Sequence, residues 1–233
     1  DYERDLFIES FWKQRDPTPG TPENEYKEEI TKRFLYANEN FNHGTSSEGW
    51  MTDMARIYII LGPPVSIDRF PSGLDIYPCE VWSYYGDVSK GQPVHFSLVF
   101  FQRGGAGEYK LYSPISDGPA SLLVQGKNMD PFDYEKLYDK ILEAEPDLAA
   151  VCLSLVPGDI PYNFRPSPED VIILANIFES PKKDVNPIYS THFLNYKGVV
   201  STEYLTNYVD STADIAFIQD PLLGINFLNF SIV

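Results

Sequence analysis

The chain has 233 residues, of which 43% are hydrophobic and 15% aromatic, so it can bury a core and has the composition of a globular protein. Its 34 Asp and Glu residues outnumber 18 Lys and Arg residues, and the net charge of −16 repels nucleic acid and anionic lipid. No apolar stretch reaches the roughly 18 residues of a membrane-spanning helix. The surplus of aromatic residues suits strands, or surfaces that bind partners.

Two helices are predicted at the start of the chain. Apolar residues recur at helical spacing between residues 2 and 15, and the prolines of residues 16–22 end that helix because each fixes φ. Thr21 offers an N-cap, with Pro22 at the first helical position, for a second helix that reaches about residue 41. The buried stripe of this second helix is expected to be Tyr26, Ile30, Phe34 and Leu35.

Strand patterns follow. Residues 56–61 are apolar and bounded by Gly-Pro-Pro, which predicts a strand. Further strands are predicted at 80–85, 94–103 and 108–112, with Gly104 to Gly107 as the hairpin loop between the last two. Helices first and strands afterwards indicate the α+β class, with the N-terminal helix pair packed on a small, mainly antiparallel sheet.

The remaining chain is predicted to mix helices and strands. Asp130 is expected to cap a helix over 131–145, a strand is expected at 148–156, and a second capped helix opens at residues 167–170. β-structure is predicted at 189–196, 199–209, 215–219 and the terminal apolar run 224–233.

These elements suggest an α+β domain over 1–115, a mixed helix and strand segment over 116–198, and a β-rich segment over 199–233. Because the last apolar run stops abruptly, it either pairs with an earlier strand or begins a longer β domain, and the second alternative is favoured. The start at an Asp likewise suggests that a leader or further domain precedes it.

Several motifs stand in a fixed order in the first half. They are a run over 11–26 that contains Trp12, Arg15, Asp16 and Pro17, then Gly49-Trp50-Met51-Thr52-Asp53, then Arg56 with the turn Gly62-Pro63-Pro64. Over residues 4–112 this order resembles the bacterial GWxTD-domain family. Residues 80–84 are similar to the family's Trp-containing strand, whereas Met54-Ala55 stands where members often carry Arg-Gly.

The resemblance implies a bacterial protein that is exported or associated with the cell envelope, often with an upstream leader and a downstream β-rich extension. It implies no particular activity. The expected location is therefore extracytoplasmic, in the periplasm or at the envelope.

The Gly49 to Asp53 motif has two interpretations. In the structural one, Gly49 permits a turn of either φ sign, Trp50 buries its ring against the two helices, and Thr52 and Asp53 cap backbone N–H groups. In the functional one, Asp53 lines a polar binding site together with His43 and Arg56. The structural interpretation is favoured because Thr and Asp beside a tight turn are usually caps.

Signals of cofactor or metal chemistry are weak. Gly62-Pro63-Pro64 lacks the Gly-Lys-Ser/Thr that cradles phosphate, and its prolines remove N–H donors. Cys79 and Cys152 lack C-x-x-C spacing, so cysteine ligation of zinc is excluded, although the two could pair in an oxidising compartment.

The histidines His43, His95 and His192 have no zinc-site spacing, and residues 210–214 lack the glycine of a calcium loop. We therefore predict no metal and no cofactor.

Two functional hypotheses remain. The first is a non-catalytic structural or interaction subunit of the bacterial envelope, with other proteins as partners and a membrane-embedded complex as one candidate. The second is an envelope hydrolase or carbohydrate-binding module whose site includes Trp50, Asp53, Trp82 and His95.

Overall fold

A computed structural model describes residues 2–42, 48–71, 73–124 and 128–189, together with the backbone of 213–220 and 225–232. The chain divides into two compact units, one formed by residues 29–183 and the other by 1–28 with 184–233. Residue 115, where the sequence suggests a domain boundary, lies inside the first of these units. The α+β class is confirmed.

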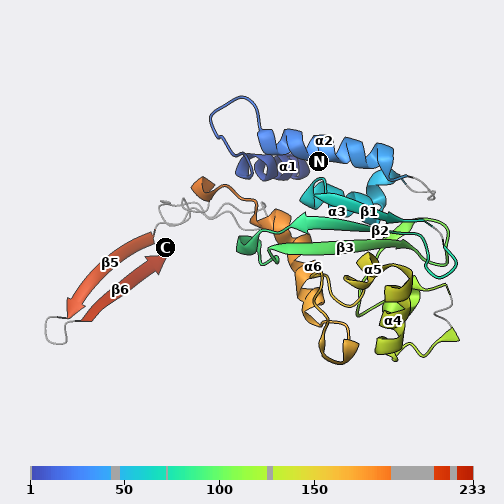
Figure 1. The fold of residues 1–233 in the computed structure, drawn as a ribbon. Coiled ribbons are helices and arrows are strands. Elements are labelled where there is room, and N and C mark those ends of the chain that lie inside the picture. The colour runs from blue at the N-terminus through green and yellow to red at the C-terminus, as the bar shows by residue number, and fades with distance from the viewer. Residues whose placement is uncertain are drawn as a thin grey trace. The chain divides into compact units, whose positions relative to one another are not determined.

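A four-stranded antiparallel sheet is the centre of the 29–183 unit, with strand order β1-β2-β3-β4 (Figure 1). Its strands are β1 (Ser66–Phe70), β2 (Cys79–Tyr85), β3 (His95–Gln102) and β4 (Tyr109–Leu111). The predicted strands at 80–85, 94–103 and 108–112 are thus confirmed, and Gln102 pairs with Tyr109 across the predicted glycine loop. β1 was not predicted because the adjacent exposed residues Asp68 and Arg69 interrupt the alternation of apolar and polar residues that indicates a strand.

Both faces of this sheet are buried. Trp82 and Leu98 point to one face, where they pack with helices α3 (Asp53–Leu61) and α6 (Glu169–Glu179). Val81 and Val99 point to the other, where they pack with α4 (Tyr134–Ala144) and α5 (Pro146–Ala149). Phe96 and residues 98–101 of β3 are fully buried, and this explains why the strand reads as a continuous apolar run.

Two predicted strands are wrong. Residues 56–61 belong to helix α3, which Thr52 caps by accepting a hydrogen bond from the Ala55 N–H at 3.2 Å. Residues 148–156 form the end of α5 and a series of turns. Both segments are short apolar runs, and such runs bury equally well as helix or strand.

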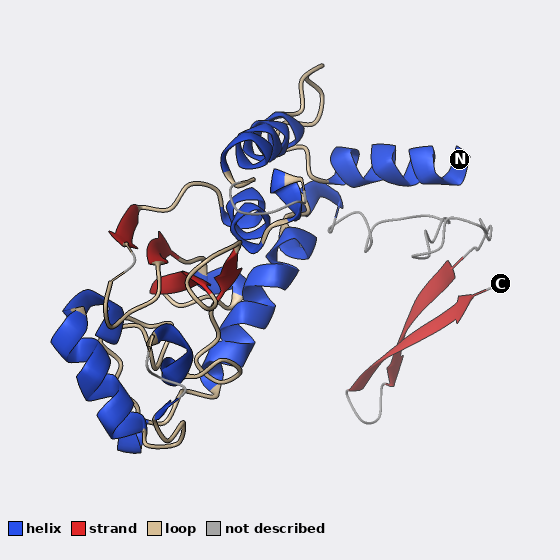
Figure 2. Cartoon of the chain, turned by 90° about the vertical axis from the view of Figure 1, so that its right-hand side faces the viewer, coloured by secondary structure: helices blue, strands red, loops and turns tan. Residues whose placement is uncertain are grey.

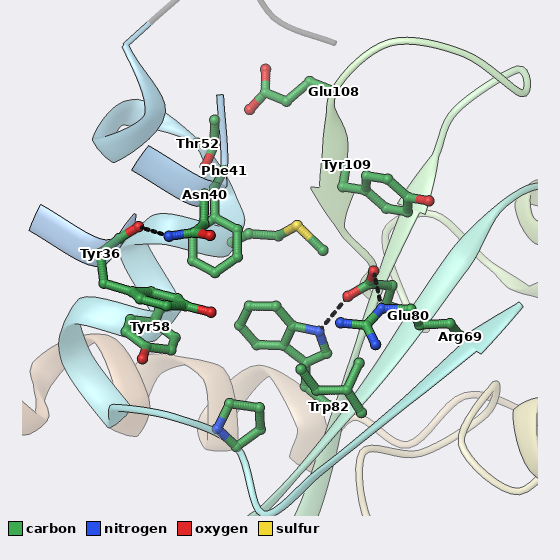
Figure 3. A pocket seen from close by; sticks show the side chains of 13 residues that line it. Tyr36, Asn40, Phe41, Thr52, Tyr58, Arg69, Glu80, Trp82, Glu108 and Tyr109 are labelled. Atoms are coloured by element: carbon green, nitrogen blue, oxygen red, sulfur yellow. Dashed lines mark hydrogen bonds and ion pairs between the residues drawn. The ribbon is translucent and has the colours of Figure 1, made fainter. Parts of the chain in front are cut away.

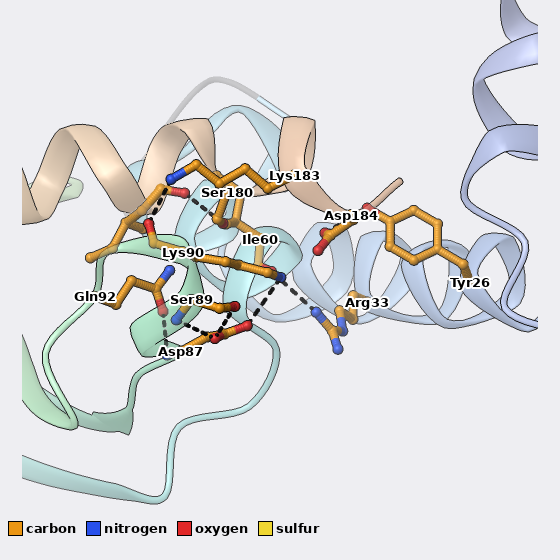
Figure 4. Close-up of polar contacts among 11 residues, drawn as sticks. Tyr26, Arg33, Ile60, Asp87, Ser89, Lys90, Gln92, Ser180, Lys183 and Asp184 are labelled. Atoms are coloured by element: carbon orange, nitrogen blue, oxygen red, sulfur yellow. Dashed lines mark hydrogen bonds and ion pairs between the residues drawn. The ribbon is translucent and has the colours of Figure 1, made fainter. Parts of the chain in front are cut away.

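The ends of α3 and α6 are held by polar contacts. Arg33 donates to the carbonyls of Ile59 and Ile60 at 3.4 and 3.3 Å, which satisfies acceptors in the last turn of α3. Just beyond α6, Lys183 donates to the Lys90 carbonyl at 2.8 Å (Figure 4). These contacts fix the two helices that cover the Trp82 face.

Helix α2 (Glu25–Asn40) departs from the prediction in two ways. Asn24, rather than Thr21, is the capping residue, since its side chain accepts from the Lys27 N–H at 2.8 Å. The predicted buried stripe is also wrong, because Phe34 and Leu35 are 38% and 55% exposed and Ala37 is the buried residue of this helix.

In the unit formed by 1–28 and 184–233, α1 spans Tyr2–Gln14, and the Tyr26 hydroxyl donates to Asp184 at 3.2 Å (Figure 4). Figure 2 shows the antiparallel hairpin of β5 (Ala213–Asp220) and β6 (Ile225–Ile232), which confirms the last two predicted strands. Apart from residue 189, the predicted strands 189–196 and 199–209 lie outside the described residues.

Across the described residues, no helix combines the length and the apolar character needed to span a bilayer.

Candidate functional site

The Gly49 to Asp53 motif forms a short 3₁₀ turn, Gly49–Met51, that leads directly into α3. The buried Thr52 hydroxyl donates to the Gly49 carbonyl at 2.9 Å, in addition to capping α3. The Asp53 carboxylate accepts from the backbone N–H of Leu111 at 3.0 Å and so ties the helix to β4. The expected capping role of Thr52 is confirmed, whereas Asp53 reaches across to the sheet.

Gly49 was expected to permit a turn of either φ sign and Trp50 to bury its ring, and the structure differs on both points. Gly49 has no positive φ, but a Cβ there would lie 2.9 Å from the Ala37 carbonyl oxygen and closer still to that of Asn38. Glycine is therefore needed for close approach to α2. The Trp50 ring is 39% exposed and contacts Phe34 at a centroid distance of 5.8 Å, so the expected burial of Trp50 is wrong.

The remaining motif residues of the 29–183 unit are Arg56 and the turn Gly62-Pro63-Pro64. Arg56 lies on the surface of α3, and the turn ends this helix. The exposed Arg56 places its guanidinium 4.4 Å from the Phe178 ring centroid, which ties α3 to α6. Gly62 ends α3 with φ of 84°, a conformation that favours glycine. Pro63 is exposed and Pro64 half-buried in the turn that follows.

The N-terminal motif residues lie in the other unit and make local contacts. Trp12 packs on Phe11 at 5.0 Å, and the buried Arg15 places its guanidinium 3.8 Å from the same Phe11 ring centroid. Asp16 accepts from the Thr18 N–H at 3.0 Å, which forms a turn around Pro17. These contacts give each of the residues a structural role.

A pocket of about 230 Å³ opens between the α2–α3 region and the sheet (Figure 3). Its lining residues are Tyr36, Asn40, Phe41, Thr52, Met54, Tyr58, Pro64, Ile67, Arg69, Glu80, Trp82, Glu108 and Tyr109. We call it the aromatic pocket. It is smaller than the roughly 300–1,000 Å³ usual for drug-sized ligands, so it suits a small group or one side chain.

Four aromatic rings pack against one another along one wall of the aromatic pocket (Figure 3). Tyr36 and Tyr58 are stacked at 4.7 Å, and Phe41 meets both rings edge-on at 6.0 and 5.6 Å. Trp82 lies 5.5 Å from Phe41 and is only 1% exposed. Each ring supports its neighbours, so this wall is formed before any ligand arrives.

The charged side chains of the aromatic pocket already have partners. Glu80 accepts from the Trp82 indole N–H at 2.8 Å and pairs with the Arg69 Nε at 3.0 Å. Glu108 pairs with Lys110 at 2.9 Å. Burial raises the pKa of the Tyr58 hydroxyl, so the phenol stays neutral well above physiological pH.

The sequence identified this pocket only in part. Thr52, Pro64 and Trp82 line it, whereas Trp50 and Asp53 do not. His95 is exposed beside the Tyr85 ring, and His43 lies outside the described residues. Of the four residues in the second hypothesis, only Trp82 lines the pocket.

Tyr36, Phe41 and Tyr58 were missed by sequence reasoning. The signal that could have found Tyr58 is the helical spacing of the buried Met54 and Ile57, which assigns 53–61 to a helix.

Other groups with chemical potential lie in the core. Cys79 and Cys152 are free and buried, and burial raises the pKa of each thiol to about 12. Asp170 is 2% exposed, accepts from the Leu155 N–H at 3.1 Å, and has a second carboxylate oxygen without a hydrogen-bond partner. Burial raises the pKa of Asp170 to about 6.

The described residues contain no group of His, Cys, Asp and Glu side chains arranged to hold a metal ion. The calcium alternative at 210–214 falls largely outside those residues.

Searches against protein-family models, curated proteins and solved structures found no match to this chain.

Proposed function

We propose that this chain is a non-catalytic interaction subunit of a bacterial cell envelope, and that the aromatic pocket is where it holds a partner. The observation that carries the proposal is the preformed wall of Tyr36, Phe41, Tyr58 and Trp82. Aromatic side chains supply a large contact area at a low entropic cost, because they have few rotatable bonds. The envelope location rests on the resemblance of residues 4–112 to GWxTD domains.

The chemistry of the pocket favours binding over catalysis. Its carboxylates are engaged in ion pairs or in the Trp82 hydrogen bond. A general acid or base needs a titratable group within reach of the substrate, with a pKa suited to the working pH. Asp53 does not line the pocket, and one of its carboxylate oxygens accepts from the Leu111 N–H and so ties α3 to the sheet.

Copurification of the tagged chain from membranes of the source cell tests the proposal. The wild-type chain is expected to retain a protein partner, and Tyr58→Ala is expected to lose it because the substitution removes a ring from the pocket wall. Tyr85→Ala is the matched control, since Tyr85 is 73% exposed on β2 and does not line the pocket. Circular dichroism of each variant checks that its fold is intact.

A chain that runs alone at its monomer mass would refute the proposal. So would a folded Tyr58→Ala variant that retains the same partner as the wild type. Turnover of a cell-wall glycan by the wild-type chain, abolished by Asp53→Asn, would instead support the hydrolase hypothesis.

A further inference from the structure

A second pocket of the 29–183 unit shares no described lining residue with the aromatic pocket. It has a volume of about 510 Å³, which is within the roughly 300–1,000 Å³ usual for pockets that hold a small organic ligand. Its described lining residues are Ile115, Phe132, Tyr134, Arg165 and Pro166, so we call it the Arg165 pocket.

The guanidinium of Arg165 is exposed and makes no hydrogen bond, ion pair or ring contact with any described residue. Every other arginine of the chain lies in the described part and contacts a carboxylate, a carbonyl or an aromatic ring there. The chain has 34 acidic side chains to 18 basic ones, so an arginine without an acidic partner is unusual in it. Arg165 is therefore available to an anion from outside the chain.

The lining around Arg165 suits an anion that carries an apolar group. None of the described lining residues is acidic, and the Tyr134 hydroxyl, which has no partner among the described residues, can donate a further hydrogen bond. Phe132 and Ile115 are 76% and 45% exposed, so apolar surface stands open in the same pocket. A carboxylate can accept two parallel hydrogen bonds from a guanidinium, while an apolar group beside it covers that surface.

The backbone that carries Arg165 is anchored on both sides. The preceding Phe164 has a positive φ of 56°, which is rare for a bulky residue, and its ring packs on the buried Tyr138 at 5.2 Å. Just after Arg165, the Ser167 N–H donates to the Leu153 carbonyl at 3.1 Å. The arginine is thus held in position before any ligand arrives, and only its side chain has to be ordered.

The other wall of the Arg165 pocket is also held by its backbone. The Phe132 N–H donates to the Asp130 carboxylate at 3.0 Å, which forms a turn. Tyr134 begins helix α4, and the Asp133 side chain caps this helix. The exposed ring and the free hydroxyl therefore project from ordered backbone.

A single cation favours a carboxylate over a phosphate. A phosphate monoester carries about −1.5 to −2 charges at pH 7, whereas Arg165 is the one cation among the described lining residues. The net charge of −16 over the chain further disfavours a second negative charge on the ligand. One guanidinium matches one carboxylate.

We propose that the Arg165 pocket binds the C-terminal carboxylate of a peptide whose last side chain is apolar. In a terminal residue the carboxylate and the side chain share one Cα, so the first can reach Arg165 while the second covers Phe132. An internal Asp or Glu needs a neighbouring residue to supply the apolar group. Capture of a terminal carboxylate is a recurrent mode of peptide recognition.

The test is a titration of the full chain with short peptides, followed by NMR. The probe is acetylated Ala-Ala-Phe with a free carboxylate, and its C-terminal amide is the neutral control. The amide of acetylated Ala-Glu-Phe offers an internal carboxylate instead. The Nε–H signal of Arg165, assigned as the one lost in Arg165→Gln, is expected to shift with the free acid alone. The free acid is expected to bind at least about fivefold more tightly than either amide.

Variants of the lining separate the charged part of the site from the apolar part, with backbone amide signals reporting binding in each. Arg165→Gln is expected to abolish the preference for the free acid, whereas Lys136→Gln makes the same change in net charge at an exposed residue outside the pocket and keeps it. Tyr134→Phe is expected to weaken binding of the acid about two- to fivefold. Phe132→Ala is expected to weaken acid and amide alike, so that the preference persists.

Equal binding of the acid and its amide would overturn the proposal and leave an apolar pocket. Tighter binding of the peptide with the internal Glu would overturn it in favour of an acidic segment, and tighter binding of phenyl phosphate would do so in favour of a phosphoryl ligand. An acid that shifts no signal of Arg165 would also count against it. Loss of the copurified partner on Tyr58→Ala concerns the aromatic pocket alone, so failure of one proposal leaves the other standing.

Discussion

Substitution of Gly49 by alanine tests the structural account of the family-like motif most directly. A Cβ at this position would lie 2.9 Å from the Ala37 carbonyl oxygen, and closer still to that of Asn38, whereas ordinary contact begins near 3.4 Å. Both opposing atoms are backbone, so α2 or the 3₁₀ turn must move. Overpacking of this kind costs typically about 1–3 kcal/mol. Reduced flexibility of the unfolded chain returns about 0.4–1 kcal/mol, so a net loss of about 1–2 kcal/mol is expected.

Urea denaturation followed by circular dichroism measures the free energy of unfolding of Gly49→Ala. Gly73→Ala is the matched control, because its Cβ would find its nearest neighbour, the Ile76 carbonyl oxygen, at 4.0 Å, with no positive φ. The control is expected to be neutral or slightly stabilising. A Gly49→Ala variant as stable as this control would show that the close approach to α2 does not constrain residue 49, and the reasoning would fail.

Three further predictions concern polar groups that are partly or fully buried. Asp53→Ala removes the acceptor for the Leu111 N–H and is expected to lower the free energy of unfolding by about 1–2 kcal/mol. Asp53→Asn keeps an acceptor, so its free energy of unfolding should fall by less. Equal decreases for the two variants in urea denaturation would contradict this prediction. The folded-state pKa of Asp170 is raised from 3.8 to about 6, so its contribution to stability is present below pH 4 and is lost as the pH rises through about 6. Asp170→Asn should remove this decline in thermal unfolding measured from pH 4 to 7, and an unchanged pH profile would rule out Asp170 as its source. With thiol pKa values of about 12, Cys79 and Cys152 should resist a thiol reagent at pH 8 until urea unfolds the chain; rapid labelling of the native protein would refute their burial.

Strands were predicted well where the sequence carries two independent signals. β3 and β4 combine apolar, β-prone runs with a glycine-rich loop, and they pair as expected. α3 had only its apolar run, because Thr52 was expected to cap backbone N–H groups beside a tight turn and not the start of a helix. Because the segment was assigned to a strand, Tyr58 was not recognised as a residue of the pocket wall, although it contacts three of the other rings. The ambiguity of this one helix therefore explains why Tyr58 was missed, whereas Tyr36 was missed although its helix α2 was predicted.

By itself the sequence determined the α+β class, three strands of the central sheet and the capping role of Thr52, because these depend on patterns within a few residues. The tertiary structure alone decided that Trp82 is buried and Trp50 half-exposed. It also decided that Tyr36, Tyr58 and Trp82 share one pocket. Such proximity depends on which segments meet across the fold, and residues 36, 58 and 82 are brought together only when α2, α3 and β2 pack.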